Sequence, residues 1–190
     1  MDLKPHASIA EFFHEVVTDA IKNQHVDASQ PTEYYLVNLL ATFATLAPCN
    51  EPLAIKLVSA QSAPPDERVK QLKDVGDTSL YVSGFFAESL ERKLVDVDYY
   101  IQIGGSAYVQ LSRYFRGFRH SEVFGDVFDE LAQKFPRFVD VLAEISERTS
   151  MTSNTGVVQL YERWLRTGSE RIAQRLREKG VLPKKSPELQ

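Results

Sequence analysis

Glu11 and His14 have the spacing of one half of a di-iron site, in which a glutamate and a histidine three positions apart bind metal from one helix. Such a site needs a second pair of this kind and two further glutamates, and the sequence offers only this pair. In a helix, both side chains would lie at least about 100° from the centre of the apolar stripe that contains Phe12 and Val16, and so would point toward solvent. We therefore expect no bound metal.

The cysteine and histidine content indicates no nucleophile motif. Cys49 is the single cysteine, and the four histidines are scattered along the chain. Although Cys49 stands just before an expected helix, where the dipole can activate a thiol, most lone cysteines are buried or incidental. Gly104-Gly105-Ser106 lacks the strand and the lysine of a phosphate-binding loop. We assign no catalytic residue, no metal ligand and no cofactor, and an enzyme with an unrecognised site is the least favoured class.

Tyrosines and polar residues gather in one part of the sequence. The group consists of Tyr81, Asp98, Tyr100, Gln102, Gly104 and Tyr108. Tyrosine hydroxyls that enter a core need hydrogen-bond partners, so the simpler interpretation is a satisfied buried network. The functional alternative is a pocket near Tyr100 and Gly104 that binds a small apolar or anionic ligand through a few polar groups.

Three arginines form a row that could bind a partner or an anion. Arg113, Arg116 and Arg119 follow one side of an expected helix, and the next helix begins near Ser121. Guanidinium groups bind carboxylates and phosphates, and the amides at a helix start also favour anions. The simpler interpretation is a solvated face, because most exposed charges contribute little to binding or stability.

A long helix over residues 95–119 must position both groups. Apolar side chains such as Ile103, Ala107 and Leu111 fall on one face and are expected to be buried. The adjacent glycines Gly104 and Gly105 cost about 1–2 kcal/mol in a helix interior, which close packing against a neighbouring helix would offset. We expect this helix at the centre of the domain.

Helical periodicity recurs along the rest of the chain, and we find no alternating strand pattern. The sequence predicts an all-α fold of about eight or nine helices, in one compact domain over residues 1–190 with short flexible tails at 1–6 and 182–190. Gly76-Asp77 is expected to interrupt the helix that starts at Pro64-Pro65, and Asp77 to cap the next one.

Charge and hydropathy limit the function classes. Residues 1–100 carry 15 acidic and 8 basic residues, whereas 101–190 carry 11 and 14, within a net charge of −4. No basic stripe predicts nucleic-acid binding, no segment is long and apolar enough for membrane insertion, and no secretory signal is evident, so we expect a cytoplasmic protein. The favoured function is non-catalytic: the basic C-terminal half binds a protein partner or, as the charge polarity allows, a second copy of the chain.

Overall fold

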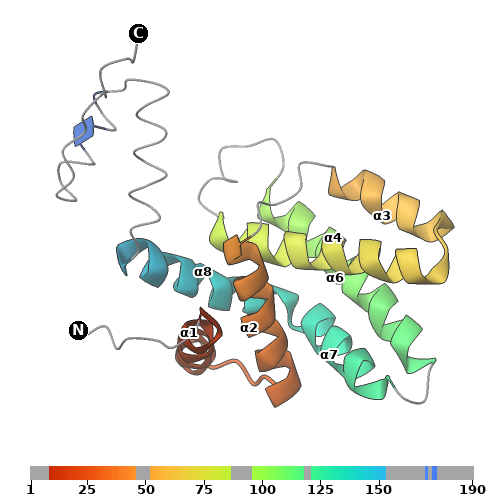
Figure 1. Cartoon of the computed structure of the whole chain (residues 1–190), viewed down its shortest axis with the longest axis horizontal. Helices are drawn as coiled ribbons and strands as arrows, with labels where there is room; N and C mark the ends of the chain where they lie inside the picture. The colour runs from red at the N-terminus through yellow and green to blue at the C-terminus, as the bar shows by residue number, and fades with distance from the viewer. Residues whose placement is uncertain are drawn as a thin grey trace, which may run out of the picture. The chain divides into compact units, whose positions relative to one another are not determined.

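The computed structural model describes residues 9–45, 52–86, 96–117, 121–152, 170 and 173–174. In these residues the chain is helical and contains no strand (Figure 1). The helices are α1 (Ile9–Asn23), α2 (Gln30–Thr45), α3 (Leu53–Ser62), α4 (Pro65–Phe85), α6 (Val97–Arg116), α7 (Glu122–Gln133) and α8 (Phe135–Thr152). The predicted all-α class is confirmed, and seven helices in the described residues compare with the eight or nine expected for the whole chain.

The contacts divide the chain into two compact units, residues 1–146 and 147–190. The first unit holds α1 to α7 and most of α8, and its core and site are described below. Both expected tails, 1–6 and 182–190, lie outside the described residues, so they and the single domain over 1–190 stay predictions.

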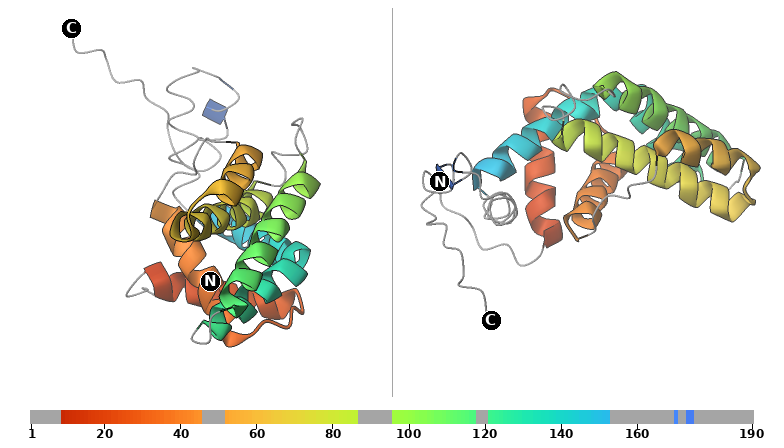
Figure 2. Two further views of the ribbon diagram at one scale, coloured as in Figure 1. Left: turned by 90° about the vertical axis from the view of Figure 1, so that its right-hand side faces the viewer. Right: turned by 90° about the horizontal axis from the view of Figure 1, so that it is seen from above.

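Helices α4 and α6 pack closely because glycines lie at their contact, and the two helices are neighbours in the right-hand view of Figure 2. A Cβ atom placed on Gly76 of α4 would lie 2.4 Å from Cε1 of Tyr108 of α6. In the other direction, a Cβ on Gly104 of α6 would lie 2.6 Å from Cβ of Ser79 and 2.5 Å from Cζ of Phe135. These separations are below van der Waals contact, so only glycine permits this packing.

The expected helix break at Gly76-Asp77 is wrong. Helix α4 runs without interruption from Pro65 to Phe85, and Asp77 lies in its interior rather than at a cap. The ring of Tyr108 leaves no space for a side chain at Gly76. The Asp77 carboxylate accepts hydrogen bonds from tyrosines of two other helices. A glycine that signals a break locally can therefore be retained in a helix for a tertiary reason, and this continuity lowers the helix count by one.

Helix α6 matches the predicted segment 95–119 within its described residues. It starts at Val97, where the Asp96 side chain accepts a hydrogen bond of 3.0 Å from the Tyr99 backbone N–H, and it ends at Arg116. Ala107 and Leu111 are fully buried as expected, whereas Ile103 is only partly buried. The helix contacts α3, α4 and α7, and its place at the centre of the whole domain stays a prediction.

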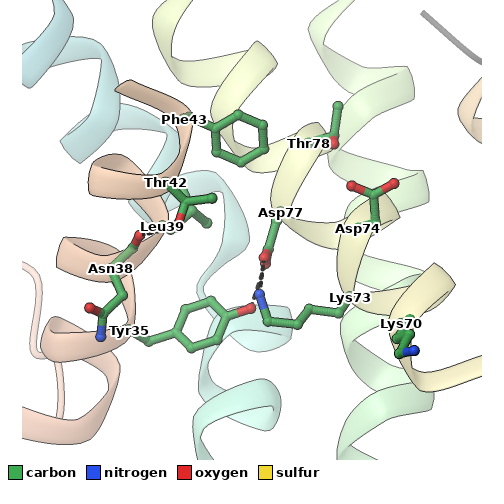
Figure 3. A pocket seen from close by; sticks show the side chains of 10 residues that line it. All are labelled: Tyr35, Asn38, Leu39, Thr42, Phe43, Lys70, Lys73, Asp74, Asp77 and Thr78. Carbon is green, nitrogen blue, oxygen red and sulfur yellow. Dashed lines mark hydrogen bonds and ion pairs between the residues drawn. The ribbon is translucent and has the colours of Figure 1, made fainter. Parts of the chain in front are cut away.

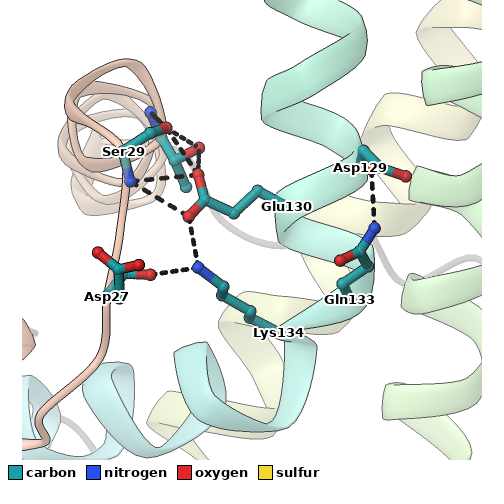
Figure 4. Close-up of polar contacts among 7 residues, drawn as sticks. Asp27, Ser29, Asp129, Glu130, Gln133 and Lys134 are labelled. Carbon is teal, nitrogen blue, oxygen red and sulfur yellow. Dashed lines mark hydrogen bonds and ion pairs between the residues drawn. The ribbon is translucent and has the colours of Figure 1, made fainter.

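A carboxylate from α7 caps the start of α2 (Figure 4). Glu130 accepts hydrogen bonds of 2.6 Å from each of the hydroxyls of Ser29 and Thr32, 3.1 Å from the Ser29 backbone N–H and 2.9 Å from the Lys134 ammonium. Lys134 also donates to the carbonyl of Asp27. A negative charge at the positive end of the α2 dipole stabilises the helix, and the same contacts join α7 to α2.

We expect Glu130 to make stability dependent on pH. Burial by itself would raise the pKa of Glu130, but the hydrogen bonds from Ser29, Thr32 and Lys134 outweigh it and lower the pKa. Because the folded pKa is below the unfolded pKa, the stabilisation is fully present above the ordinary glutamate pKa of about 4.3 and is lost as the pH falls through the folded value.

Urea unfolding of Glu130→Gln and wild type, at steps from about pH 7 down to about pH 3, measures this effect across the glutamate titration range. The variant should be less stable near neutral pH, and the difference should shrink in acid. Glu122→Gln, on an exposed residue in the first turn of the same helix, is the control. A stability difference for Glu130→Gln that stays constant with pH contradicts the expectation.

Candidate functional site

A cleft of about 330 Å³ lies between α2 and α4 (Figure 3). Its α2 wall consists of Tyr35, Asn38, Leu39, Thr42 and Phe43, and its α4 wall consists of Lys70, Lys73, Asp74, Asp77 and Thr78. On each helix these residues are spaced at positions i, i+3, i+4, i+7 and i+8, which places them on one face. The cleft therefore exists because the two helices turn one continuous face each toward the same space.

The Asp77 carboxylate, 7% exposed, is the most buried charged group on the cleft wall. Its Oδ1 accepts hydrogen bonds from the hydroxyls of Tyr35 at 2.5 Å and Tyr108 at 2.8 Å. Its Oδ2 pairs with the Lys73 ammonium, one turn earlier on α4. A buried charge is tolerated only when it is paired and hydrogen-bonded, and here both oxygens are engaged by three different helices.

The two tyrosines act as hydrogen-bond donors at neutral pH. Burial raises the pKa of Tyr108 well above its ordinary value, and the negative charge of Asp77 and contact with Tyr35 raise it further. Burial and then Asp77 also raise the pKa of Tyr35, which outweighs a small opposite effect of Tyr108. Both phenols therefore stay protonated, so the trio holds a carboxylate in place and does not supply a phenolate base.

Lysines surround the entrance of the cleft. The Lys73 ammonium lies 5.2 Å from the centroid of the Tyr35 ring, so it interacts with the aromatic face as well as with Asp77. Asp74, also on the α4 wall, pairs with Lys56 from α3. Lys70 is exposed and makes no ion pair with any residue that the structure describes. Among the charged residues that line the cleft, Lys70 is therefore the one without an ionic partner in the described residues.

The opposite end of the cleft is apolar. The Phe43 ring stacks on Tyr81 with centroids 4.4 Å apart and planes 5° apart, and Tyr81 stacks in turn on Phe85 at 4.8 Å. Leu39 is buried beside Phe43 on α2, and Thr78 faces them from α4. The cleft thus combines one charged end with one aromatic end, which is a common composition for small-molecule sites.

The six residues predicted as a pocket near Tyr100 and Gly104 do not line this cleft. Tyr108 and Tyr81 lie behind its wall, where the first binds Asp77 and the second stacks on Phe43. The space beside Gly104 is filled by the ring of Phe135 and by Ser79. Asp98 and Gln102 are exposed, and Tyr100 is partly exposed, with its pKa raised by burial and then by Tyr99. A pocket formed by these six residues therefore stays a prediction, separate from the cleft between α2 and α4.

No sequence-based prediction names Tyr35, Lys73 or Asp77 as a site residue. A usable signal is present, because charged and polar residues of α4 recur at i, i+3, i+4, i+7 and i+8, and polar, aromatic and leucine residues of α2 recur with the same spacing. Asp77 also falls among apolar helix positions, between Leu72 and Leu80, where an acid is costly without a buried partner. The local pattern Gly76-Asp77 instead predicts a helix cap at this acid.

The arginine row is not uniform. Arg113 is exposed and has no ion pair within the described ranges. Arg116 is already engaged, because its Nη2 lies 2.9 Å from Asp129 and 3.6 Å from Asp126 of α7. Arg119 lies outside the described residues. Binding by all three arginines together stays a prediction, and Arg116 would have to share its carboxylate contacts with a partner.

The described ranges contain no group of three or more histidine, cysteine, aspartate or glutamate side chains that could hold a metal ion. Glu11 and His14 are both exposed on α1, as their spacing predicted, whereas Cys49 lies outside those ranges. In the same ranges, no helix has both the length and the apolar character needed to span a membrane. Cytoplasmic location and the absence of a nucleic-acid partner stay predictions.

Comparison with known proteins identifies no relative: no protein-family model, no curated protein and no solved structure matches this chain.

Proposed function

We propose that this chain is a non-catalytic helical protein that binds a small molecule in the cleft between α2 and α4. The observation that carries the proposal is the cleft itself, about 330 Å³ in volume, with the buried Asp77 carboxylate held in its wall by two tyrosine hydroxyls and a lysine. Ligand sites commonly have volumes from about 300 to 1,000 Å³ and place a few polar groups in an apolar lining.

Binding is favoured over catalysis by the state of the polar groups. The hydroxyls of Tyr35 and Tyr108 are both donated to Asp77, and the raised pKa values keep them protonated. Asp77 accepts from these two donors and from Lys73, so no lone carboxylate is left to act as a general base. The arrangement fixes the cleft wall and presents a surface of constant shape and charge to a ligand.

A blocked cleft tests the proposal. Thr42 is an exposed residue of the α2 wall, so Thr42→Phe should fill the cleft beside Phe43 with little effect on folding. Ala44→Phe adds a ring to an exposed position of the same helix that does not line the cleft, and serves as the matched control. Native mass spectrometry of the purified proteins, with a thermal-shift screen of a metabolite library, measures binding.

We expect a small molecule that copurifies with, or raises the melting temperature of, wild type and Ala44→Phe but not Thr42→Phe. Equal binding by Thr42→Phe would place the ligand elsewhere. A wild-type protein that carries no small molecule and responds to none in the library contradicts the proposal.

A second candidate function is a protein interaction through the basic C-terminal half. Val123 and Phe124 at the start of α7 are 60% and 56% exposed, and the Phe124 ring lies 5.7 Å from Phe115 of α6. Arg113 is exposed two residues before Phe115. Exposed aromatic side chains near an arginine are typical of interaction surfaces, and a protein partner or a second copy of the chain would use such a surface rather than the cleft.

A further inference from the structure

We infer that the cleft between α2 and α4 takes a small amphipathic anion, with its carboxylate beside Lys70 and Lys73 and its apolar part beside Leu39 and Phe43. The inference rests on the proposed function and adds the chemical class of the ligand.

The ion pairs on the cleft wall indicate whether the ligand carries a positive or a negative charge. Two carboxylates line the cleft, and each already has a cationic partner: Asp77 pairs with Lys73, and Asp74 pairs with Lys56. A cationic ligand would have to displace one of these lysines. Lys70, in contrast, has no ionic partner in the part of the chain that the structure describes, so a ligand carboxylate would meet a free ammonium.

The shape of the cleft separates a charged end from an apolar end. Lys70 and Thr78 are eight positions apart on α4, which corresponds to about 12 Å along a helix. Figure 3 shows Tyr35, Lys73 and Lys70 toward one end and Phe43 and Thr78 toward the other. An elongated molecule with one anionic end fits this polarity, whereas an anion without an apolar part would leave the Phe43 end unoccupied.

The apolar end also offers a neutral hydrogen-bonding group. Thr78 lines the cleft, and a threonine hydroxyl can both donate and accept a hydrogen bond. A ligand with a second polar atom, distant from its carboxylate, would meet this hydroxyl.

Three probes of nearly equal shape test the charge preference: 3-phenylpropanoate, 3-phenylpropanamide and 3-phenylpropylamine. Isothermal titration of each into the full-length protein should show the carboxylate binding most tightly. Its affinity should fall as salt is raised, because the contact with Lys70 is exposed. The affinity of the neutral amide should depend little on salt.

Variants of Lys70 assign the preference to that side chain. Lys70→Met keeps the apolar stem and should weaken binding of the carboxylate about fivefold, while Lys70→Arg should retain it within about twofold. Lys22→Met removes an exposed lysine of α1 that does not line the cleft, and should have no effect.

The failure of this inference can be distinguished from that of the proposed function. If the amine or the amide binds as tightly as the carboxylate, or if Lys70→Met leaves the carboxylate affinity unchanged, the inference is overturned while small-molecule binding in the cleft stands. If none of the three probes binds although the metabolite screen finds a cleft ligand that is not an anion, the inference also fails alone. If neither experiment finds a ligand, both fail.

Discussion

Replacing Gly104 with leucine is expected to lower the free energy of unfolding by about 3 kcal/mol. The reason is overpacking: even the Cβ atom would lie 2.5 Å from the Phe135 ring and 2.6 Å from Cβ of Ser79. Gly104 itself is buried at the contact of α6 with α4, so the larger side chain would push helices apart. Urea unfolding followed by circular dichroism measures the change, and Gly104→Ala offers a milder version should the leucine variant not fold.

The neighbouring glycine provides a control in the same helix. Among the residues that the structure describes, no atom lies within 4 Å of a Cβ placed on Gly105, so Gly105→Leu should be tolerated. It should even stabilise the protein by up to about 1 kcal/mol, because glycine is a poor helix former. Equal stability of the Gly104→Leu variant and wild type would show that the two helices do not cross closely at this point.

Replacing Asp77 with alanine should also cost about 3 kcal/mol, for an electrostatic reason. The hydroxyls of Tyr35 and Tyr108 would lose their shared acceptor, and Tyr108 is fully buried and has no access to water. Each buried donor left without a partner costs about 1–3 kcal/mol. Asp77→Asn keeps one oxygen as an acceptor for the tyrosines and should lose less. Denaturant unfolding of wild type, Asp77→Asn and Asp77→Ala measures their order of stability directly.

Asp74→Ala is the matched control for this prediction. Asp74 lies on the same helix and also pairs with a lysine, but its side chain is 42% exposed. Exposed ion pairs contribute about 0–1 kcal/mol, so the loss should be small. If Asp77→Ala and Asp74→Ala were equally mild, the tyrosine–aspartate network would not be a significant source of stability.

The helical class and the start of α4 could be predicted from the sequence because they depend on residues close together along the chain. Pro65 follows Pro64 at the start of α4. Helix α6 begins at Val97 after its Asp96 cap, two residues later than the predicted limit at 95. Hydrophobic residues repeated every three or four positions, so the buried positions Ala107 and Leu111 were predicted correctly. Ile103, one turn earlier, is only partly buried, because a periodic face does not show how far the neighbouring helices extend along it.

Gly104 and Gly105 illustrate a feature that local sequence cannot predict, namely which residue of a pair contacts a neighbouring helix. The sequence indicated that Gly104-Gly105 needs close packing, yet only Gly104 contacts other helices closely, through Ser79 and Phe135. Similarly, Gly76-Asp77 has the local pattern of a helix break, and the helix continues. Which side of a glycine pair meets a neighbour depends on helix crossing, and a crossing is set by side chains from segments that are remote in sequence.

What the sequence by itself determined about this protein is the all-α class, the amphipathic face of each helix and the exposure of Glu11 and His14, since each follows from a spacing of a few residues. The candidate site was decided only by tertiary structure. Asp77 finds Tyr35 42 positions before it and Tyr108 31 positions after it. No short-range pattern specifies such partners: the three helices come together to bury their apolar faces, and the tyrosine hydroxyls then meet the Asp77 carboxylate, which this packing removes from water.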